Sequence, residues 1–279
     1  MNEINFNKDI QLEEEQQLLF NDFFLLLNET TKNKLSKRDC LRFLRARKWN
    51  IQKASEMANN WDDWYCRPIP GAGDVTPQTI LNNIEDKNEE VYRNLMPHSN
   101  MYEDKEGRPI YWELTGEISS RFSQVLQSLT CDDLVIRHIR QQELMVKRME
   151  FSSKKHNKPI EQQVIVFNLA NLSYSVDTNA MSVFRQTLAI DEAFYPERLY
   201  RLYMINAPWF FTAIWSMIRP WLDPITANKI QILGSDFIDT LREHIDDNQI
   251  PPLYGGTGQD FTWQWPFPPE YGCHRFIYK

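Results

Sequence analysis

The sequence predicts an α/β fold with a mostly parallel sheet, preceded by a small domain made only of helices. Two observations carry this prediction. Between residues 97 and 244, short apolar runs rich in β-branched side chains alternate with segments of helical periodicity, which is typical of parallel strands joined by helical crossovers. Before residue 66 the apolar side chains follow helical spacing only. A chain of 279 residues is long enough for one large domain and a smaller one.

Three helices are expected in the N-terminal part. Residues 8–29 carry leucine and phenylalanine side chains at helical spacing. Ser36 is followed three residues later by Asp39, the spacing of a capping box, which predicts a helix from there to about Lys48. A third helix is expected over residues 51–65, because alanine, methionine and tryptophan side chains recur on one face.

The larger part of the chain is predicted to alternate between strands and helices. The run at 164–167 is continuously apolar and β-branched, which suits a strand that is covered on both faces. In chain order we expect strands at 97–102 and 109–115, a helix at 130–156, the strand at 164–167, a helix at 178–194, a strand at 200–206, an apolar segment at 209–222, a strand at 230–233 and a helix at 236–244.

Composition also suggests where the domains end. Proline and glycine at 67–73 mark a linker, so the helical domain is placed at residues 1–70 and the α/β domain at 88–257. The tail at 258–279 holds many aromatic side chains among prolines. We expect it to pack back on the body, because so many exposed aromatic rings are unusual on a soluble protein.

The charge and the cysteines limit the class of protein. A net charge of -7 argues against nucleic acid as a partner, and the basic residues between Lys37 and Lys48 are interpreted as a solvated helix face. No run approaches the roughly 20 apolar residues of a membrane-spanning helix, and residues 1–15 do not resemble a secretory signal. The four scattered cysteines are interpreted as reduced thiols. The sequence therefore predicts a cytoplasmic protein.

No motif of a common enzyme class is present. The sequence lacks GxSxG, GxxxxGK[ST], GxGxxG and HExxH patterns. The five histidines show no metal-ligand spacing. We therefore predict no catalytic residue, no metal and no cofactor, although a serine or zinc site assembled only in space would leave no such motif.

The most apolar stretch, at 208–222, has two interpretations. Its apolar side chains form a broad helical stripe, as in a buried helix over the sheet. The same stripe, with bulky aromatics and the cation of Arg219, also suits a helix that covers a lipid cavity and enters a membrane interface. In the second interpretation the gate residues are Phe210, Phe211, Ile214, Trp215, Ile218 and Trp221.

A short segment after this stretch combines polar groups at a helix start. Asp223 before Pro224 predicts an N-cap followed by proline at the first helical position. Thr226 and Lys229 then lie on one side of the first turns. A hydroxyl, an ammonium and the positive end of a helix dipole favour phosphate, but ordinary surface helices begin in the same way.

Several short segments occur together in the order of a known family. They are RFLRARK at 42–48, YPER at 195–198, NAP at 206–208, WLDPIT at 221–226, KI at 229–230 and YGGT at 254–257. With them the chain resembles CRAL-TRIO proteins of the yeast phosphatidylinositol/phosphatidylcholine transfer type, over about residues 36–257. The resemblance implies a helical domain, then a lipid-binding α/β domain whose sheet floors an apolar cavity, with 209–222 as the helix that gates it.

The resemblance also implies a headgroup site. Family members that bind phosphatidylinositol use an arginine, a glutamate, a threonine and a lysine, which match Arg47, Glu197, Thr226 and Lys229 here. Lys229 and Thr226 would bind the phosphodiester. Arg47 and Glu197 would contact each other and the inositol hydroxyls.

The resemblance leaves the second ligand open. Family members that carry phosphatidylcholine use a serine and a threonine on a central strand, where this chain has Gln163 and Ile165, and two tyrosines, matched by Tyr111 and replaced by Asn100. Isoleucine cannot donate a hydrogen bond to a phosphate. A different second ligand is therefore expected: a sterol, an isoprenoid or another phospholipid.

The implied function is that of a monomeric, non-enzymatic lipid carrier in the cytoplasm. It would bind phosphatidylinositol and a second lipid, contact membranes transiently and have a lipid kinase as a candidate partner. Gate aromatics would contact the membrane, so Trp215→Asp is expected to slow exchange more than it lowers bound lipid. Two alternatives stay open: a carrier or sensor of another hydrophobic ligand, and a scaffold that presents lipid without transferring it.

Overall fold

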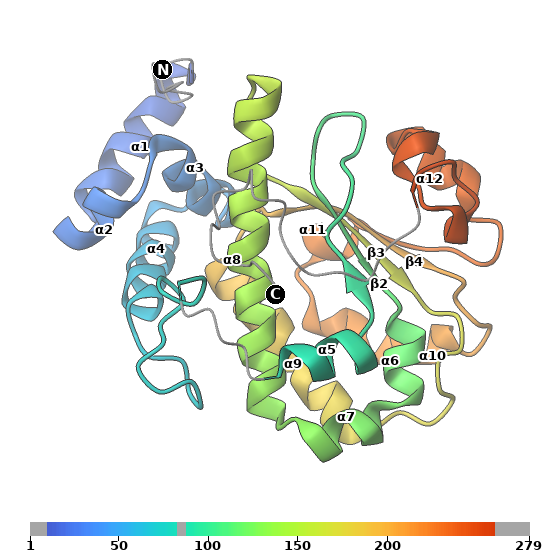
Figure 1. Cartoon of the computed structure of the whole chain (residues 1–279). Helices are drawn as coiled ribbons and strands as arrows, with labels where there is room; N and C mark the ends of the chain where they lie inside the picture. Colours follow the sequence, from blue (N-terminus) through green and yellow to red (C-terminus); the bar gives the residue numbers. More distant parts are fainter. Residues whose placement is uncertain (1–9, 83–87, 260–279) are drawn as a thin grey trace.

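The computed structural model describes residues 10–82 and 88–259 (Figure 1). Its N-terminal domain is helical, as predicted. Ser36 and Asp39 form the expected capping box, in which each side chain accepts a hydrogen bond from the backbone N–H of the other residue. The four helices of this domain are α1 Glu14–Leu25, α2 Glu29–Lys34, α3 Lys37–Ala46 and α4 Ile51–Tyr65. Between them lies a core that includes Phe23, Phe43, Leu44 and Met57.

A five-stranded sheet forms the centre of the larger domain. Its strands lie side by side in chain order. The first pair is antiparallel and the other three pairs are parallel, so the predicted mostly parallel sheet is confirmed. The strands are β1 His98–Ser99, β2 Ile110–Glu113, β3 Gln163–Asn168, β4 Leu199–Ile205 and β5 Ile230–Ile232.

The parallel strands are joined by helical crossovers, as predicted. α8 (Cys131–His156) begins with a second capping box and ends at Asn157 in the left-handed conformation. α9 (Thr178–Phe194) begins at Asp177, whose carboxylate caps the first turn. The remaining helices are α5 Glu89–Leu95, α6 Thr115–Ser120, α7 Phe122–Ser128, α10 Phe211–Ile218, α11 Pro224–Ala227 and α12 Ile238–His244, with 3-10 turns η1 Arg219–Trp221, η2 Asp247–Gln249 and η3 Pro252–Tyr254.

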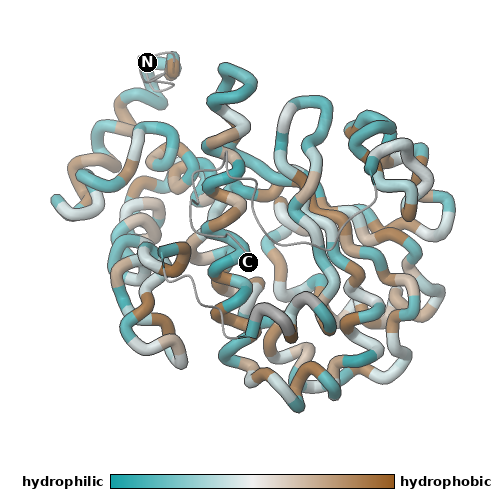
Figure 2. The backbone as a smooth tube through the Cα atoms, viewed as in Figure 1, coloured by the Kyte–Doolittle hydropathy of each residue, from teal (hydrophilic) through white to brown (hydrophobic). Residues whose placement is uncertain are grey.

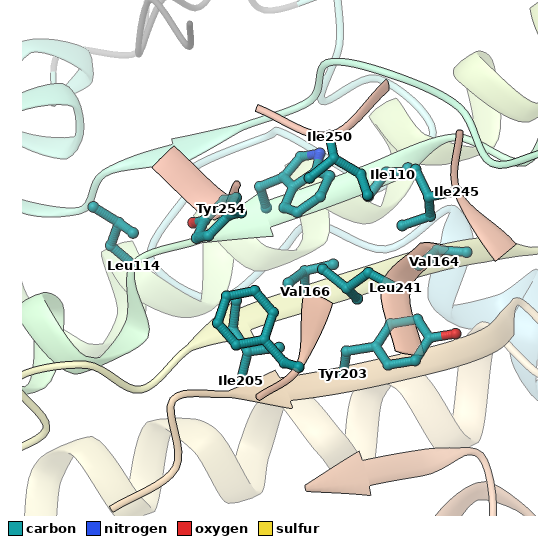
Figure 3. Packing of buried hydrophobic residues seen from close by; sticks show 12 residues of the cluster. Ile110, Leu114, Val164, Val166, Tyr203, Ile205, Leu241, Ile245, Ile250 and Tyr254 are labelled. Carbon is teal, nitrogen blue, oxygen red and sulfur yellow. The ribbon is translucent and has the colours of Figure 1, made fainter. Parts of the chain in front are cut away.

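The two faces of the sheet are covered differently. On one face Val164, Val166 and Tyr203 are fully buried against Leu241 and Ile245 of the α12 region (Figure 3). Figure 1 shows α12 on the side of the sheet away from α8 and α9. Figure 2 shows hydrophobic residues gathered in the strands, whereas the C-terminal end of α8 is hydrophilic. The alternate strand residues therefore point toward α8, α9 and α10.

Some details of the fold differ from the predictions. Helices α2, α5, α6 and α7 were not expected, because each has only six or seven residues and shows no hydrophobic period. β1 is shorter than the strand predicted at 97–102. The expected packing of the tail concerns residues that, from 260 onward, lie outside the described part of the chain.

The helical domain packs on α8 and α9. The ring of Trp64 in α4 stacks on Phe194, with the ring centroids 4.1 Å apart. The hydroxyls of Tyr65 and Tyr195 donate hydrogen bonds of 3.1 and 2.7 Å to the carboxylate of Glu143. Burial raises the pKa of the Glu143 carboxyl, although both hydroxyls act in the opposite direction. These contacts fix the end of α9 just before the turn at 195–198.

Gly116 is a position where the fold leaves no room for a side chain. A Cβ atom there would lie 2.0 Å from the carbonyl oxygen of Ala170, which is backbone and cannot rotate away. We expect Gly116→Ala to destabilise the protein by about 3 kcal/mol, or roughly 10 °C in Tm, although alanine is the better helix former. The matched control is Gly234→Ala, where a Cβ meets nothing within 4 Å. Equal melting temperatures for the two variants would contradict the close approach of α6 to the Ala170 backbone.

Candidate functional site

A cavity of about 320 Å³ lies over the second face of the sheet. Its walls come from α8, α9 and α10, and most of its lining is apolar. The predicted arrangement of a sheet that floors an apolar cavity is therefore confirmed. The apolar part of the floor consists of Tyr111, Ile165, Phe167, Leu202, Met204 and Ile230.

The predicted gate segment forms the part of the wall over β4. Four of the six predicted gate residues line the cavity, namely Phe211, Ile214, Trp215 and Ile218. The other two contact the outside of α9 or its preceding loop instead: Phe210 packs edge-on against Tyr174, and the Trp221 ring lies 5.5 Å from the Arg185 guanidinium.

The two tryptophans Trp209 and Trp215 point in different directions. Trp215 lines the cavity, so its expected contact with a membrane would require α10 to open. The exposed aromatic of the segment is Trp209, whose side chain is 82% exposed. Helical periodicity alone cannot distinguish the inward from the outward part of a segment that is apolar all round.

Exposed aromatic rings gather beside the gate. Phe210 contacts Tyr174, which is 74% exposed, and Trp209, with ring centroids 5.1 and 5.9 Å apart. We call Tyr174, Trp209 and Phe210 the aromatic rim. Tyr174 belongs to the loop before α9, and its neighbours Ser173 and Ser175 line the cavity. The aromatic rim therefore borders the cavity wall, and sequence reasoning missed Tyr174 because a loop has no period.

The lining also contains polar groups that the sequence did not single out. One group joins His138, Gln142 and Asp191: the imidazole and the amide approach the same carboxylate oxygen at 2.7 and 2.8 Å. Gln163 extends this group, because its amide donates to Gln142 at 3.3 Å. The only available signal was the spacing of polar residues within α8, which places them on one face with apolar neighbours.

A second polar group surrounds Tyr111. Its hydroxyl donates a hydrogen bond of 2.7 Å to Glu113, and burial raises its pKa. The hydroxyl of Thr115 donates to the other oxygen of Glu113 at 3.0 Å. Arg137 of α8 lies beside Tyr111 and Glu113. Tyr111 is thus the one predicted ligand residue that lines the cavity itself.

Three of the other predicted ligand residues meet outside the cavity. Lys229 directly precedes β5, and its ammonium lies 3.4 Å from the carboxylate of Glu197, just before β4. Thr226 lies in α11, and its carbonyl oxygen accepts a hydrogen bond from the Lys229 backbone. As predicted, α11 begins with Asp223 as N-cap and Pro224 at its start. Parallel β4 and β5 therefore bring Glu197, Thr226 and Lys229 to one edge of the sheet.

Arg47 does not make the contact with Glu197 that was expected. It follows α3, and its guanidinium donates to the carbonyl oxygen of Ala46 at 3.3 Å. Arg42 of the same helix reaches the turn instead and donates to the carbonyl oxygen of Pro196 at 3.0 Å. The helical domain thus contacts the Glu197 turn through Arg42, and Glu197 pairs with Lys229.

The backbone of Glu197 is held in an unfavourable conformation. Its φ of 58° lies in the left-handed region, which residues other than glycine rarely adopt. Such a conformation costs about 1 kcal/mol or more. A glutamate in this conformation, where glycine would be unstrained, points to a functional demand on its carboxylate.

The turn is held by a partly buried charge cluster between the domains. The Asp39 carboxylate lies 2.7 Å from Arg42 and 3.6 Å from Arg198. Burial alone would raise the pKa of Asp39, but the charges of the two arginines outweigh it and lower this pKa to about 2. Arg198 directly follows Glu197, so the cluster fixes the position of the Glu197 turn.

Asp39 makes the stability of the protein depend on pH. Because its folded pKa lies below its ordinary value of 3.8, its contribution is fully present at neutral pH and is lost as the pH falls from about 4 toward 2. We expect Asp39→Asn to lower the free energy of unfolding by about 2 kcal/mol at pH 7, with a smaller deficit at pH 3. Urea unfolding at both pH values measures this. The control is Asp63→Asn, at an exposed pair with Arg67, which should change stability by less than about 1 kcal/mol. A deficit of Asp39→Asn that does not depend on pH would contradict the lowered pKa of Asp39.

Comparison with known proteins defines the class. The CRAL/TRIO domain family matches residues 99–256, and the CRAL/TRIO N-terminal domain family matches residues 21–60. The chain therefore belongs to the CRAL/TRIO family. Within residues 10–82 and 88–259, no helix combines the length and the apolar content that crossing a bilayer requires.

Several relatives within this family are similar to the chain over most of its length. The Sec14 cytosolic factor of Schizosaccharomyces pombe is 31% identical over 220 residues, which cover 78% of this chain and 74% of that protein. A CRAL-TRIO domain-containing protein of Saccharomyces cerevisiae is 31% identical over 88% of this chain and 78% of its own length. The phosphatidylinositol/phosphatidylcholine transfer protein SFH7 of Arabidopsis thaliana is 33% identical, over 77% of this chain and 38% of that protein.

A solved structure supports the fold. The crystal structure of Sfh5 superposes with a TM-score of 0.69, covering 91% of this chain and 90% of that one. Its sequence identity is 16%, so this likeness concerns the architecture alone.

Proposed function

We propose that the protein binds phosphatidylinositol and transfers it between membranes. One observation carries the proposal: the polar cluster of Glu197, Thr226 and Lys229 adjoins an apolar cavity, because Lys229 is followed directly by Ile230, which lines that cavity. The names of SFH7 and of other relatives, as phosphatidylinositol/phosphatidylcholine transfer proteins, agree with it. The bound lipid would be the cargo, and no cofactor is required.

The polar cluster supplies the chemistry for an inositol phosphate headgroup. The Lys229 ammonium and the Thr226 hydroxyl would bind the phosphodiester by charge-assisted and neutral hydrogen bonds. The Glu197 carboxylate would then exchange part of its contact with Lys229 for an inositol hydroxyl. Arg47 lies at the end of α3 and would complete the site once its side chain turns away from Ala46.

Selectivity in this scheme comes from the headgroup. A diacyl lipid buries on the order of 30 methylene groups, each worth roughly 0.8 kcal/mol on leaving water. This large free energy nearly cancels in exchange, because the bilayer and the cavity are both apolar. An unmatched buried phosphate or ammonium costs several kcal/mol, so the headgroup contacts decide which lipid is kept.

Exchange needs α10 to move, and no covalent step is involved. Opening of α10 at a membrane would join the cavity to the bilayer, and the aromatic rim would make the contact at the interface. The net charge of -7 gives little attraction to anionic surfaces, so apolar insertion dominates. We infer a monomeric cytoplasmic carrier that visits membranes transiently and delivers lipid to them or to a lipid kinase.

Phosphatidylcholine is the less suitable second cargo. Ile165 lines the cavity where a hydroxyl donor would be required, and the Gln163 amide is bound to Gln142. A ligand without a phosphocholine group fits this lining better.

Transfer of labelled phosphatidylinositol from donor to acceptor vesicles tests the proposal. Wild-type protein should accelerate transfer, and Trp209→Ser should slow it about tenfold, since one large aromatic ring no longer enters the interface. The lipid bound per protein should stay unchanged, because Trp209 does not contribute to the cavity lining. Leu253→Ser, also at an exposed apolar side chain but on the α12 side, is the control. Absence of transfer by wild type would overturn the proposal.

A further inference from the structure

Arg137 is a cavity-lining arginine whose hydrogen bonding is incomplete. Its Nη2 atom is buried and has no hydrogen-bond partner. Among the described residues that line the cavity, it is the only buried side-chain nitrogen or oxygen in this state. Buried donors are nearly always paired in folded proteins. Since Arg137 lines the cavity through other atoms, a small turn of its guanidinium would let an oxygen of a bound molecule supply the missing acceptor.

The surroundings of Arg137 balance its charge without satisfying all its donors. Tyr111 and Glu113 lie beside the guanidinium, and the ring of Tyr92 lies 5.3 Å from it. Both oxygens of Glu113 already accept hydrogen bonds from hydroxyls, those of Tyr111 and Thr115. Nearby His98 is neutral, because burial and the charge of Arg137 lower its pKa to about 3.

The other charged groups of the lining have partners of their own. Asp177 caps α9 by accepting from two backbone N–H groups. Asp191 accepts from Gln142 and lies against His138. Together with Glu113, these residues give the lining three carboxylates, compared with one guanidinium, that of Arg137.

These charges of the lining favour an uncharged ligand. An anionic headgroup would add negative charge to a lining in which carboxylates already outnumber the guanidinium, and a buried uncompensated charge is strongly unfavourable. An ammonium would find the carboxylates already engaged as acceptors. An uncharged oxygen acceptor satisfies Nη2 of Arg137 without changing the net charge.

The Arg137 site lies far from the headgroup cluster. Tyr111 and Glu113 belong to β2, whereas Lys229 directly precedes β5, and the strand order places β3 and β4 between β2 and β5. The two polar sites therefore lie on strands that are three positions apart in the sheet. Three strand spacings of about 4.8 Å amount to roughly 14 Å, which makes the sites separable by mutation.

We propose that Arg137 anchors an uncharged lipid, a sterol or a diacylglycerol, through one hydroxyl or carbonyl oxygen, and that this lipid is the second cargo of the cavity. The apolar body of the lipid would lie over Ile165 and Met204, under Phe211 and Trp215 of α10. The inference rests on the proposed function, because it names the second ligand of the same cavity.

The test compares lipid occupancy in matched variants. Wild type, Arg137→Met, the charge-balanced double variant Glu113→Gln/Arg137→Met and the control Arg67→Met, an exposed arginine after α4, are each incubated with phosphatidylcholine vesicles. The vesicles contain cholesterol, dioleoylglycerol, phosphatidic acid and phosphatidylinositol in equal amounts. Native mass spectrometry with lipid extraction then identifies what each protein carries.

We expect wild type and Arg67→Met to carry cholesterol or dioleoylglycerol, and this measurement distinguishes the two lipids. Both Arg137 variants should lose that lipid roughly ten- to a hundredfold, with phosphatidylinositol changed less than twofold. If Arg137→Met misfolds, the double variant decides, since it leaves no unpaired carboxylate.

The outcomes separate this inference from the proposed function. The role of Arg137 would be overturned if the second cargo were phosphatidylcholine or phosphatidic acid. It would also be overturned if the double variant bound as much uncharged lipid as wild type. An uncharged lipid bound without any phosphatidylinositol would overturn the proposed function and leave the Arg137 site standing.

Discussion

The double variant Thr226→Ala/Lys229→Ala is expected to lose phosphatidylinositol while it keeps the lipid that is held by the cavity alone. Truncating one member of a buried hydrogen-bonded charge pair costs about 3 kcal/mol, which is roughly a hundredfold in affinity. The loss should be selective, because neither residue lines the cavity. Binding of fluorescent phosphatidylinositol from vesicles, in competition with unlabelled lipid, measures it.

Two controls make this result specific. Lys158→Ala removes a lysine that pairs with Glu106 on the surface, and it should leave phosphatidylinositol binding within about twofold. Glu197→Gln keeps the shape of the turn and removes its charge, so it reports the carboxylate separately. An equal loss of every lipid in the double variant would mean that the change damages the cavity rather than a headgroup site.

Trp215→Asp should empty the cavity. The side chain lines the apolar lumen, and a carboxylate there costs several kcal/mol unless it is paired or hydrated. We expect bound lipid of every class to fall more than tenfold, with transfer falling in proportion. This reverses the expectation from the sequence, which assigned Trp215 to the membrane contact.

The neighbouring residue provides the matched control. Ser216 is exposed on the outer side of α10, where its hydroxyl donates to the carbonyl oxygen of Thr212. Ser216→Asp adds the same charge to the same helix and should leave bound lipid unchanged. If both variants lose lipid equally, the effect belongs to the stability of α10 and not to the lining of the cavity.

The main architecture could be predicted from local sequence signals. The helices expected at 51–65 and 178–194 have the observed ends, and the Ser36 capping box was visible as a spacing of three residues. These features depend on contacts within a few residues. Shorter helices such as α6 escaped prediction because tertiary packing, including the close approach of Gly116 to Ala170, decides them.

The site was less accessible to the sequence. The apolar stripe of α10 indicated a helix that covers an apolar surface. Which of its aromatic side chains faces inward depends on how the helix packs on β4. Glu197 pairs with Lys229 rather than Arg47 because β4 and β5 are adjacent in the sheet. The sequence does not show which strands are adjacent. Arg137 was missed because a charged residue on an amphipathic helix normally faces water.

The central claim is that the cavity and the Glu197–Lys229 cluster together hold phosphatidylinositol. Native mass spectrometry with lipid extraction, on wild-type protein incubated with mixed liposomes, tests it most directly. The account predicts one phosphatidylinositol molecule per chain in a substantial fraction of the protein, and its selective loss from Thr226→Ala/Lys229→Ala. Wild-type protein that carries other lipids but no phosphatidylinositol would contradict it.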